Sequence, residues 1–99
     1  MSAMNLDQLF TTCGELQARG QSQEALTTYK NWLAASEDPH RFMAWYNYGS
    51  LLQSTGNAQE AIQAYRHCLD LRPYFPQALI NLGLTLEKMG QRDQALQKW

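Results

Sequence analysis

Three triplets, each made of a glycine, an alanine and an aromatic residue, recur along the chain at a nearly constant spacing. The second triplet follows the first after 36 residues, and the third follows the second after 34 residues. The triplets are Gly20, Ala25 and Tyr29, then Gly56, Ala61 and Tyr65, then Gly90, Ala95 and Trp99. A period in this range is typical of stacked supersecondary units, none of which buries its apolar face alone. We therefore interpret the chain as a repeat array.

Each repeat unit is predicted to be a pair of antiparallel helices, because its apolar residues recur with the helical period. Gly20, Gly56 and Gly90 each follow such a stretch, where glycine can adopt the positive φ that ends a helix. Pro39 and Pro73 close the units, since proline has no amide hydrogen to donate. We expect a single domain over residues 1–99, with units at about residues 6–41, 42–75 and 76–99.

The third and first units depart from the regular pattern. The second helix of the third unit, about Arg92 to Trp99, is predicted to be cut off after roughly two turns. The first unit has two residues more between Tyr29 and Pro39 than the second unit has between its tyrosine and proline. We therefore expect a longer second helix in the first unit, or a looser turn before Pro39.

Two local details are predicted inside the units. Asn57 stands where it can cap the following helix, with Glu60 reaching back three residues later as in a capping box.

Gly49 and Gly83 lie within otherwise bulky helical stripes, although a glycine inside a helix costs about 1 kcal/mol relative to alanine. We expect both glycines to mark places where two helices approach closely.

Composition argues against several classes of partner. The formal net charge of the 99 residues is -1, and basic and acidic residues are interspersed without a run of either. Such a chain has no electrostatic footprint for nucleic acid or an anionic membrane. The first residues lack the pattern of a signal peptide, and no stretch approaches the roughly 20 apolar residues of a membrane span. We expect a cytoplasmic protein.

Candidate catalytic and metal-binding residues are scattered. His40 and His67 have no cysteine or carboxylate at ligand spacing, and we interpret both as surface residues. Cys13 and Cys68 lie far apart, without the close pairing of a zinc or redox motif, and are interpreted as packed residues. No pair of glutamates stands out as a general acid and base. The sequence therefore predicts no enzyme activity, no metal site and no cofactor.

The middle unit carries the fullest set of signature residues. Trp45, Tyr48 followed by Gly49, Ala61, Tyr65 and Pro73 resemble the tetratricopeptide repeat. The third unit resembles it through Leu79, Leu82 followed by Gly83, Leu86, Ala95 and Trp99. The resemblance implies an all-α fold, an α-α superhelix or solenoid of about three antiparallel helix pairs. It also implies a module that binds a peptide or partner protein and catalyses nothing.

In such a fold the first helix of each unit lines a concave groove. The resemblance places Phe10, Met43, Tyr46, Asn47, Ser50, Gln53, Gln77, Ile80, Asn81, Leu84 and Lys88 in the peptide-binding groove. Asn47 and Asn81 occupy equivalent positions of neighbouring units, so their amides are suited to bond the backbone of an extended peptide. The alternative is that both are solvated polar groups on an exposed helix face.

Narrower hypotheses concern the context of the chain. Only Asn47 fits the carboxylate clamp known in the family for chaperone tails, so that clamp is not expected. The stretch from Ala78 to Gly90 is similar to repeats that precede the catalytic domain in bacterial SPINDLY-type, O-linked N-acetylglucosamine transferase-like proteins. On that resemblance the chain presents substrate to a larger glycosyltransferase. A homodimer through the C-terminal unit is a further hypothesis, because nothing covers the stripe near Leu96 and Trp99.

Overall fold

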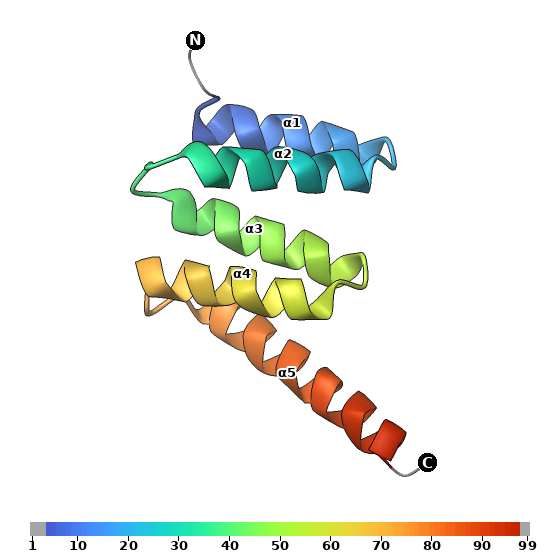
Figure 1. The fold of residues 1–99 in the computed structure, drawn as a ribbon. Coiled ribbons are helices and arrows are strands. Elements are labelled where there is room, and N and C mark those ends of the chain that lie inside the picture. The colour runs from blue at the N-terminus through green and yellow to red at the C-terminus, as the bar shows by residue number, and fades with distance from the viewer. Residues whose placement is uncertain (1–3, 98–99) are drawn as a thin grey trace.

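The computed structural model describes the backbone of residues 4–97 and the side chains of residues 4–91. Every element in that range is an α-helix, and the helices form an elongated stack measuring 53 × 32 × 19 Å (Figure 1). They are α1 (Leu6–Ala18), α2 (Ser22–Ala35), α3 (Arg41–Ser54), α4 (Ala58–Leu71) and α5 (Pro76–Gln97). The predicted all-α repeat fold is confirmed.

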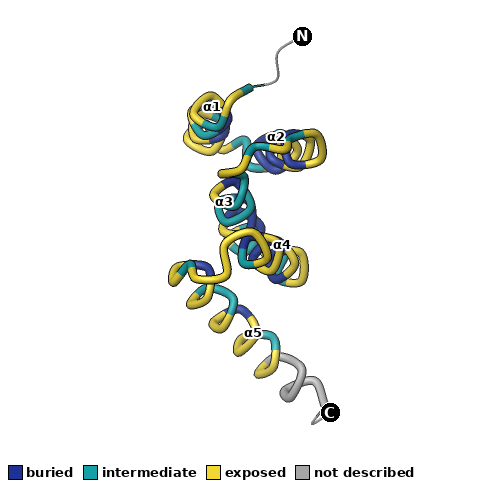
Figure 2. The backbone as a smooth tube through the Cα atoms, turned by 90° about the vertical axis from the view of Figure 1, so that its left-hand side faces the viewer, coloured by how far each residue is buried: buried dark blue, intermediate teal, exposed yellow. Residues whose placement is uncertain are grey.

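The helices are arranged in two layers. Each helix packs against the next one along the chain, and α3 also contacts α1 and α5. Figure 2 shows α1, α3 and the start of α5 on one side of the molecule, with α2 and α4 on the other. The first helix of each unit therefore lies in one layer, and the second helices of the first two units lie in the other.

Equivalent turns join α1 to α2 and α3 to α4. Gly20 and Gly56 have positive φ values of 75° and 86°, as the sequence predicts. The amide after each glycine donates over 2.8 Å to a carbonyl near the end of the preceding helix, Gln21 to Leu16 and Asn57 to Leu52. These bonds satisfy carbonyl groups that the helix end would otherwise leave without partners.

The connection between the first two units is longer than the connection that follows α4. Both α2 and α4 contain 14 residues, so the additional residues of the first unit do not extend its second helix. The connection runs over residues 36–40 after α2 and over residues 72–75 after α4. Of the two expectations for the first unit, the looser turn is the one observed.

The predicted capping box at Asn57 is wrong. The Asn57 side chain makes no cap hydrogen bond to α4, and its Nδ2 donates instead to Thr55 Oγ1 over 3.0 Å. The physical reason is the preceding turn, because the Asn57 amide is already held by Leu52 and the side chain folds back over that turn. A capping box does form at α1, where Asn5 Oδ1 accepts from the Gln8 amide over 2.8 Å and Gln8 Oε1 accepts from the Asn5 amide over 2.9 Å.

The predicted helix end at Gly90 is also wrong. α5 runs without a break from Pro76 to Gln97, so the second helix expected from about Arg92 is the end of α5, and Trp99 lies outside the described residues. The residues after Gly90 include glutamine, arginine, alanine and leucine, which favour a helix. A helical glycine costs about 1 kcal/mol, and the unbroken backbone bonds of a continuous helix offset that cost.

Close helix contact is confirmed at Gly49 and is wrong at Gly83. A Cβ added to Gly49 would lie 2.8 Å from Cε1 and 2.9 Å from Cδ1 of Tyr65, which is fully buried. A Cβ added to Gly83 would meet nothing within 4 Å. Tyr65 belongs to α4, the partner helix of α3, whereas no described helix occupies the corresponding place beside α5. The packing role of a repeat glycine therefore depends on its partner helix being present.

Buried titratable groups make the stability of the fold depend on pH. Burial raises the pKa of Cys68 from its ordinary value of 9.0 to about 11. Between these values the unfolded chain loses a thiol proton that the folded chain keeps, so the free energy of unfolding should fall as the pH rises from 9 to 11. Urea unfolding at several pH values measures this trend. We expect a shallower fall for Cys68→Ala, and equal slopes in the variant and the parent would contradict the assignment.

Candidate functional site

The residues predicted to line the groove all belong to the layer formed by α1, α3 and α5. Six of the eleven are exposed, namely Met43, Ser50, Gln77, Ile80, Leu84 and Lys88. The other five, Phe10, Tyr46, Asn47, Gln53 and Asn81, are partly buried. The set is therefore a surface of exposed side chains over a half-buried floor.

Three large apolar side chains of this surface are exposed. Ile80 is 61% exposed, Leu84 is 48% exposed and Met43 is 41% exposed. The 100° step per residue of a helix puts Ile80 and Leu84 on one side of α5, and Lys88 follows one turn later on the same side. The surface thus combines aliphatic side chains with amides, a hydroxyl and one cation.

A hydrogen bond links two members of the set across α3 and α5. Asn81 Nδ2 donates to the Tyr46 hydroxyl over 3.2 Å. The Tyr46 ring packs at 5.2 Å from the Phe75 ring and 6.0 Å from the Tyr65 ring, measured between centroids. Tyr46 is therefore fixed in place, and part of the donor capacity of Asn81 is used inside the molecule.

Each asparagine lies beside a tyrosine from the second helix of the preceding unit, an arrangement that sequence reasoning missed. Burial raises the pKa of Tyr29, and the neighbouring Asn47 side chain acts against that rise. Burial likewise raises the pKa of Tyr65, and Asn81 acts against it. Asn47 and Asn81 are 34 residues apart and Tyr29 and Tyr65 are 36 apart, so the repeat shows that the two pairs are equivalent without showing that their members meet. The amides have a structural role in addition to any contact with a ligand.

The order of helices, the glycine turns and the aromatic contacts agree with one known family. Residues 10–97 match the model of the middle TPR-like domain of cilia and flagella-associated protein 70. The chain belongs to the tetratricopeptide-repeat family. In this TPR chain, α1 with α2 and α3 with α4 are the two helix pairs that the structure describes.

Curated relatives of the TPR chain include proteins with two different names. It is 39% identical over 79 residues to the photosystem I assembly protein Ycf3 of Synechococcus elongatus, covering 79% of this chain and 46% of that protein. The Ycf3 protein of Cyanophora paradoxa is 35% identical over 77 residues, or 77% of this chain and 44% of that protein. A probable biofilm formation methyltransferase, WspC of Pseudomonas putida, is 31% identical over 83 residues, or 84% of this chain and 19% of that protein. The TPR chain thus spans less than half the length of these relatives.

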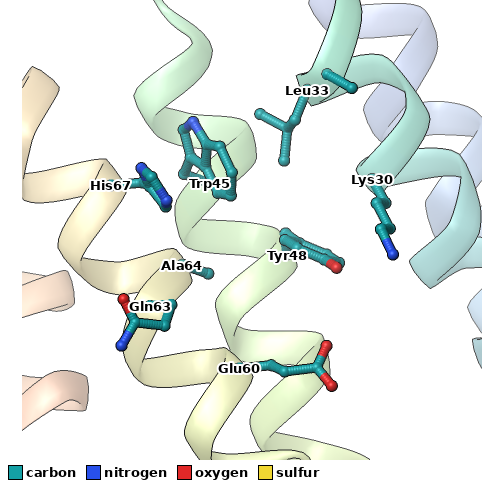
Figure 3. Close-up of a pocket in the computed structure, with 9 residues that line it drawn as sticks. Lys30, Leu33, Trp45, Tyr48, Glu60, Gln63, Ala64 and His67 are labelled. Atoms are coloured by element: carbon teal, nitrogen blue, oxygen red, sulfur yellow. The ribbon is translucent and has the colours of Figure 1, made fainter.

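His67 is exposed and stacks on a neighbouring aromatic ring. Its imidazole stacks on the Trp45 indole with ring centroids 4.3 Å apart and planes inclined by 21° (Figure 3). No group of three or more histidine, cysteine, aspartate or glutamate side chains among residues 4–91 is placed to hold a metal ion. Trp45 is partly exposed beside His67, so it is accessible as well as structural.

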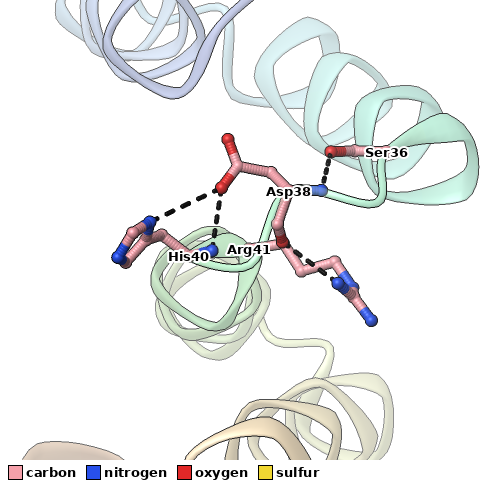
Figure 4. Close-up of polar contacts among 4 residues, drawn as sticks. All are labelled: Ser36, Asp38, His40 and Arg41. Carbon is pink, nitrogen blue, oxygen red and sulfur yellow. Dashed lines mark hydrogen bonds and ion pairs between the residues drawn. The ribbon is translucent and has the colours of Figure 1, made fainter.

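His40 lies in the connection between the first two units, where it helps to order the turn. Its amide donates to Asp38 Oδ1 over 2.8 Å, and its Nδ1 lies 3.7 Å from the same oxygen (Figure 4). The Asp38 amide donates to Ser36 Oγ over 3.1 Å, and Arg41 Nη1 donates to the Asp38 carbonyl over 3.0 Å. These contacts account for Asp38 and His40 as residues that shape the turn.

The helices α1 to α5 are 13 to 22 residues long. Within the described part of the chain, none of them combines sufficient length with an apolar character that would let it span a membrane.

Proposed function

We propose that this TPR chain is a non-catalytic module that binds an extended segment of a partner protein across α1, α3 and α5. The observation that carries the proposal is the exposure of Met43, Ile80 and Leu84 on the same layer as polar groove residues. Apolar side chains within a polar surrounding are a common feature of protein-binding surfaces. The assembly role in the name of the Ycf3 relatives supports a function in handling other proteins. A cytoplasmic location is part of the same proposal.

The aliphatic side chains supply more of the expected affinity than the asparagines. A net hydrogen bond contributes only about 0.5–1.5 kcal/mol, and Asn81 already donates to Tyr46. Complete burial of a fully exposed aliphatic side chain contributes roughly 1.5–3 kcal/mol, so Ile80 and Leu84, which are 61% and 48% exposed, contribute roughly that amount together. We therefore propose that Ile80 and Leu84 enter apolar pockets of the partner segment. The asparagine amides set the register of that bound segment.

Peptide selection tests this assignment. Short random peptides displayed on phage are selected on the full chain, and the binding of enriched peptides is compared with the variant Ile80→Ser plus Leu84→Ser. We expect binding to weaken by roughly tenfold or more, since the variant removes two exposed apolar contacts.

The matched control is Leu71→Ser, which replaces an exposed leucine of α4 in the other layer. It should leave peptide binding unchanged. Equal binding by the parent and the double variant would contradict peptide binding at Ile80 and Leu84. An equal loss of binding in Leu71→Ser and the double variant would contradict it as well.

The double variant Asn47→Ala plus Asn81→Ala has two expected effects. Peptide binding should weaken, and the fold should lose stability because each amide also lies beside a buried tyrosine. Binding measured at a temperature where circular dichroism shows the variant folded separates the two effects. Unchanged peptide affinity in the folded variant would leave the amides with a structural role alone.

Self-association is a second candidate function, carried by a different strip of α5. Leu79 is 45% exposed and Leu86 is 43% exposed, and helical geometry turns them away from Ile80 and Leu84. Leu86 borders a cavity of about 680 Å³ between α4 and α5, together with Ile62 and Met89. We propose that a second copy covers this strip. Leu96 and Trp99, which the sequence hypothesis named for the contact, have side chains outside the described residues.

Sedimentation over a range of concentrations tests self-association. We expect a dimer at high micromolar concentration that is lost in Leu79→Ser plus Leu86→Ser and kept in Ile80→Ser plus Leu84→Ser. A monomer at every concentration would contradict this candidate while leaving the peptide-binding proposal intact. The alternative that the chain presents substrate to a larger glycosyltransferase rests only on the similarity of its repeat sequences to those of such proteins. The relatives described above do not support it.

A further inference from the structure

A cavity of about 320 Å³ lies between α2, α3 and α4, on the side of the molecule opposite the groove. Its apolar lining includes Leu33 from α2, Trp45 and Tyr48 from α3, and Ala64 from α4. Lys30 and Glu60 also line it, from α2 and α4. Figure 3 shows Trp45 and His67 side by side, with Tyr48, Lys30 and Glu60 further along the cavity.

The cavity and the groove use opposite sides of α3. Turning by 100° per residue, the helix places Trp45 and Tyr48 away from Met43, Asn47 and Ser50. Figure 2 shows α2 and α4, which flank the cavity, in the layer opposite to α1 and α3. A ligand in the cavity therefore does not compete with a peptide in the groove.

The floor of the cavity is rigid and apolar. Leu33, Tyr48 and Ala64 are buried, with exposed fractions of 7%, 9% and 1%. His67 covers one face of the Trp45 indole, and the Trp45 and Tyr48 rings lie 6.1 Å apart at an angle of 56°. Because these contacts fix the ring positions, the cavity is formed before any ligand arrives, which lowers the entropic cost of binding.

The edge of the cavity carries opposite charges on its two flanking helices. Lys30 and Glu60 are both exposed, and neither forms an ion pair with another residue in the described part of the chain. Burial raises the pKa of Tyr48, and the Glu60 carboxylate raises it further, which agrees with Glu60 lying near this end of the cavity. A segment crossing the cavity would meet a cation on α2 and an anion on α4.

We propose that this cavity is a second protein-contact site, which receives one bulky apolar side chain from a partner protein. The volume is close to the lower limit of roughly 300 Å³ for small-molecule pockets, so it fits one aromatic or long aliphatic side chain and little more. Small-molecule sites also place polar groups inside to orient the ligand. Here the charged side chains stand on exposed helix faces around an apolar floor, as around an anchor residue at a protein interface.

The charges define the rest of the partner segment. An acidic residue beside the anchor pairs with Lys30, and a basic residue on the other side pairs with Glu60. Each rim pair is partly solvated and contributes little affinity by itself, so the charges fix orientation while the anchor supplies most of the binding.

The experiment selects phage-displayed random peptides on the full chain, sets aside as groove ligands those that lose binding to Ile80→Ser plus Leu84→Ser, and measures the remaining peptides on Ala34→Trp. Ala34 lines the cavity and is exposed, so the new indole fills the cavity without disturbing the core. We expect enriched peptides to share one bulky apolar residue with an acidic neighbour. Their affinity should be at least about tenfold weaker for Ala34→Trp and unchanged for the control Ala18→Trp on the exposed part of α1.

A charge reversal provides a second variant that folds without strain. Lys30→Glu should weaken the same peptides by about threefold to tenfold, while Arg19→Glu, an exposed reversal outside the cavity, should not. The indole amide of Trp45 should shift in an ¹⁵N spectrum on peptide addition, while that of Trp32, which donates to the Met4 carbonyl, should stay fixed.

Three results would overturn the proposal. The first is enriched peptides that bind Ala34→Trp and Lys30→Glu as tightly as the parent. The second is a selection that yields no peptide sensitive to either variant. The third is a Trp45 indole signal that responds to p-cresol, a side-chain mimic, but to no peptide. Because Ile80→Ser plus Leu84→Ser leaves this cavity intact, a peptide that loses binding in that variant is a groove ligand and tests the proposed function instead.

Discussion

Replacing Tyr65 with alanine is expected to lower the free energy of unfolding by about 3–5 kcal/mol, the usual range for removing a buried aromatic ring. Tyr65 is 0% exposed and lies against Gly49, where the two helices of the second unit are in close contact. Its hydroxyl also donates to Gln53 Oε1 over 2.7 Å. Since small domains are stable by only about 5–15 kcal/mol, this one change removes a large share. Urea denaturation followed by circular dichroism measures it.

Two further tyrosine variants divide the effect into its parts. Tyr65→Phe keeps the ring and removes the hydroxyl, so a loss of about 1 kcal/mol is expected. Tyr74→Ala removes a side chain that is 79% exposed, and its effect should stay within about 0.5 kcal/mol. A similar loss in Tyr65→Ala and Tyr74→Ala would mean that the ring of Tyr65 is not part of the packed core.

Alanine at the two repeat glycines is expected to have opposite effects on stability. In Gly49→Ala the new methyl group would lie 2.8 Å from the Tyr65 ring, and overpacking of this kind costs about 1–3 kcal/mol. In Gly83→Ala nothing lies within 4 Å of the new methyl group, so the higher helix propensity of alanine should stabilise the fold by up to about 1 kcal/mol. Thermal and urea unfolding of the two variants give the sign directly.

The sign at Gly83 also tests the continuous α5 helix. If the residues after Gly90 folded back as a second helix, Gly83 would face that helix as Gly49 faces α4, and Gly83→Ala would destabilise. A loss of stability in Gly83→Ala at a concentration where the chain is monomeric would therefore contradict the structure of α5. A gain supports it.

The sequence predicts the elements of this fold that depend on local chemistry. Gly20 and Gly56 occupy the left-handed positions of their turns, and Gly49 marks a close helix contact. Gly83 and Gly90 occupy the places of Gly49 and Gly56 in the repeat. Their surroundings differ, because the helix that would pack against α5 is not formed in the described residues. The repeat pattern identifies which residues are equivalent, whereas the packing around each of them depends on which neighbours are present.

The site was predictable to a smaller extent. The family resemblance assigned the predicted groove residues to the first helix of each unit, but neither it nor the repeat pattern indicated that Asn81 donates to Tyr46 or that Asn47 lies beside Tyr29. The cavity between α2, α3 and α4 was not predictable either, because it arises where side chains from these three helices leave the space beside Trp45 unfilled. Contacts of this kind depend on the relative rotation of helices, which apolar periodicity does not report.

The most direct test of the central claim is a methyl NMR titration of the full chain with a peptide enriched by the selection on the groove. The claim predicts that the methyl signals of Met43, Ile80 and Leu84 shift on peptide addition, while those of Leu71, exposed on the opposite layer, do not. Shifts confined to α2 and α4, with the three groove methyl signals unchanged, would contradict binding across α1, α3 and α5.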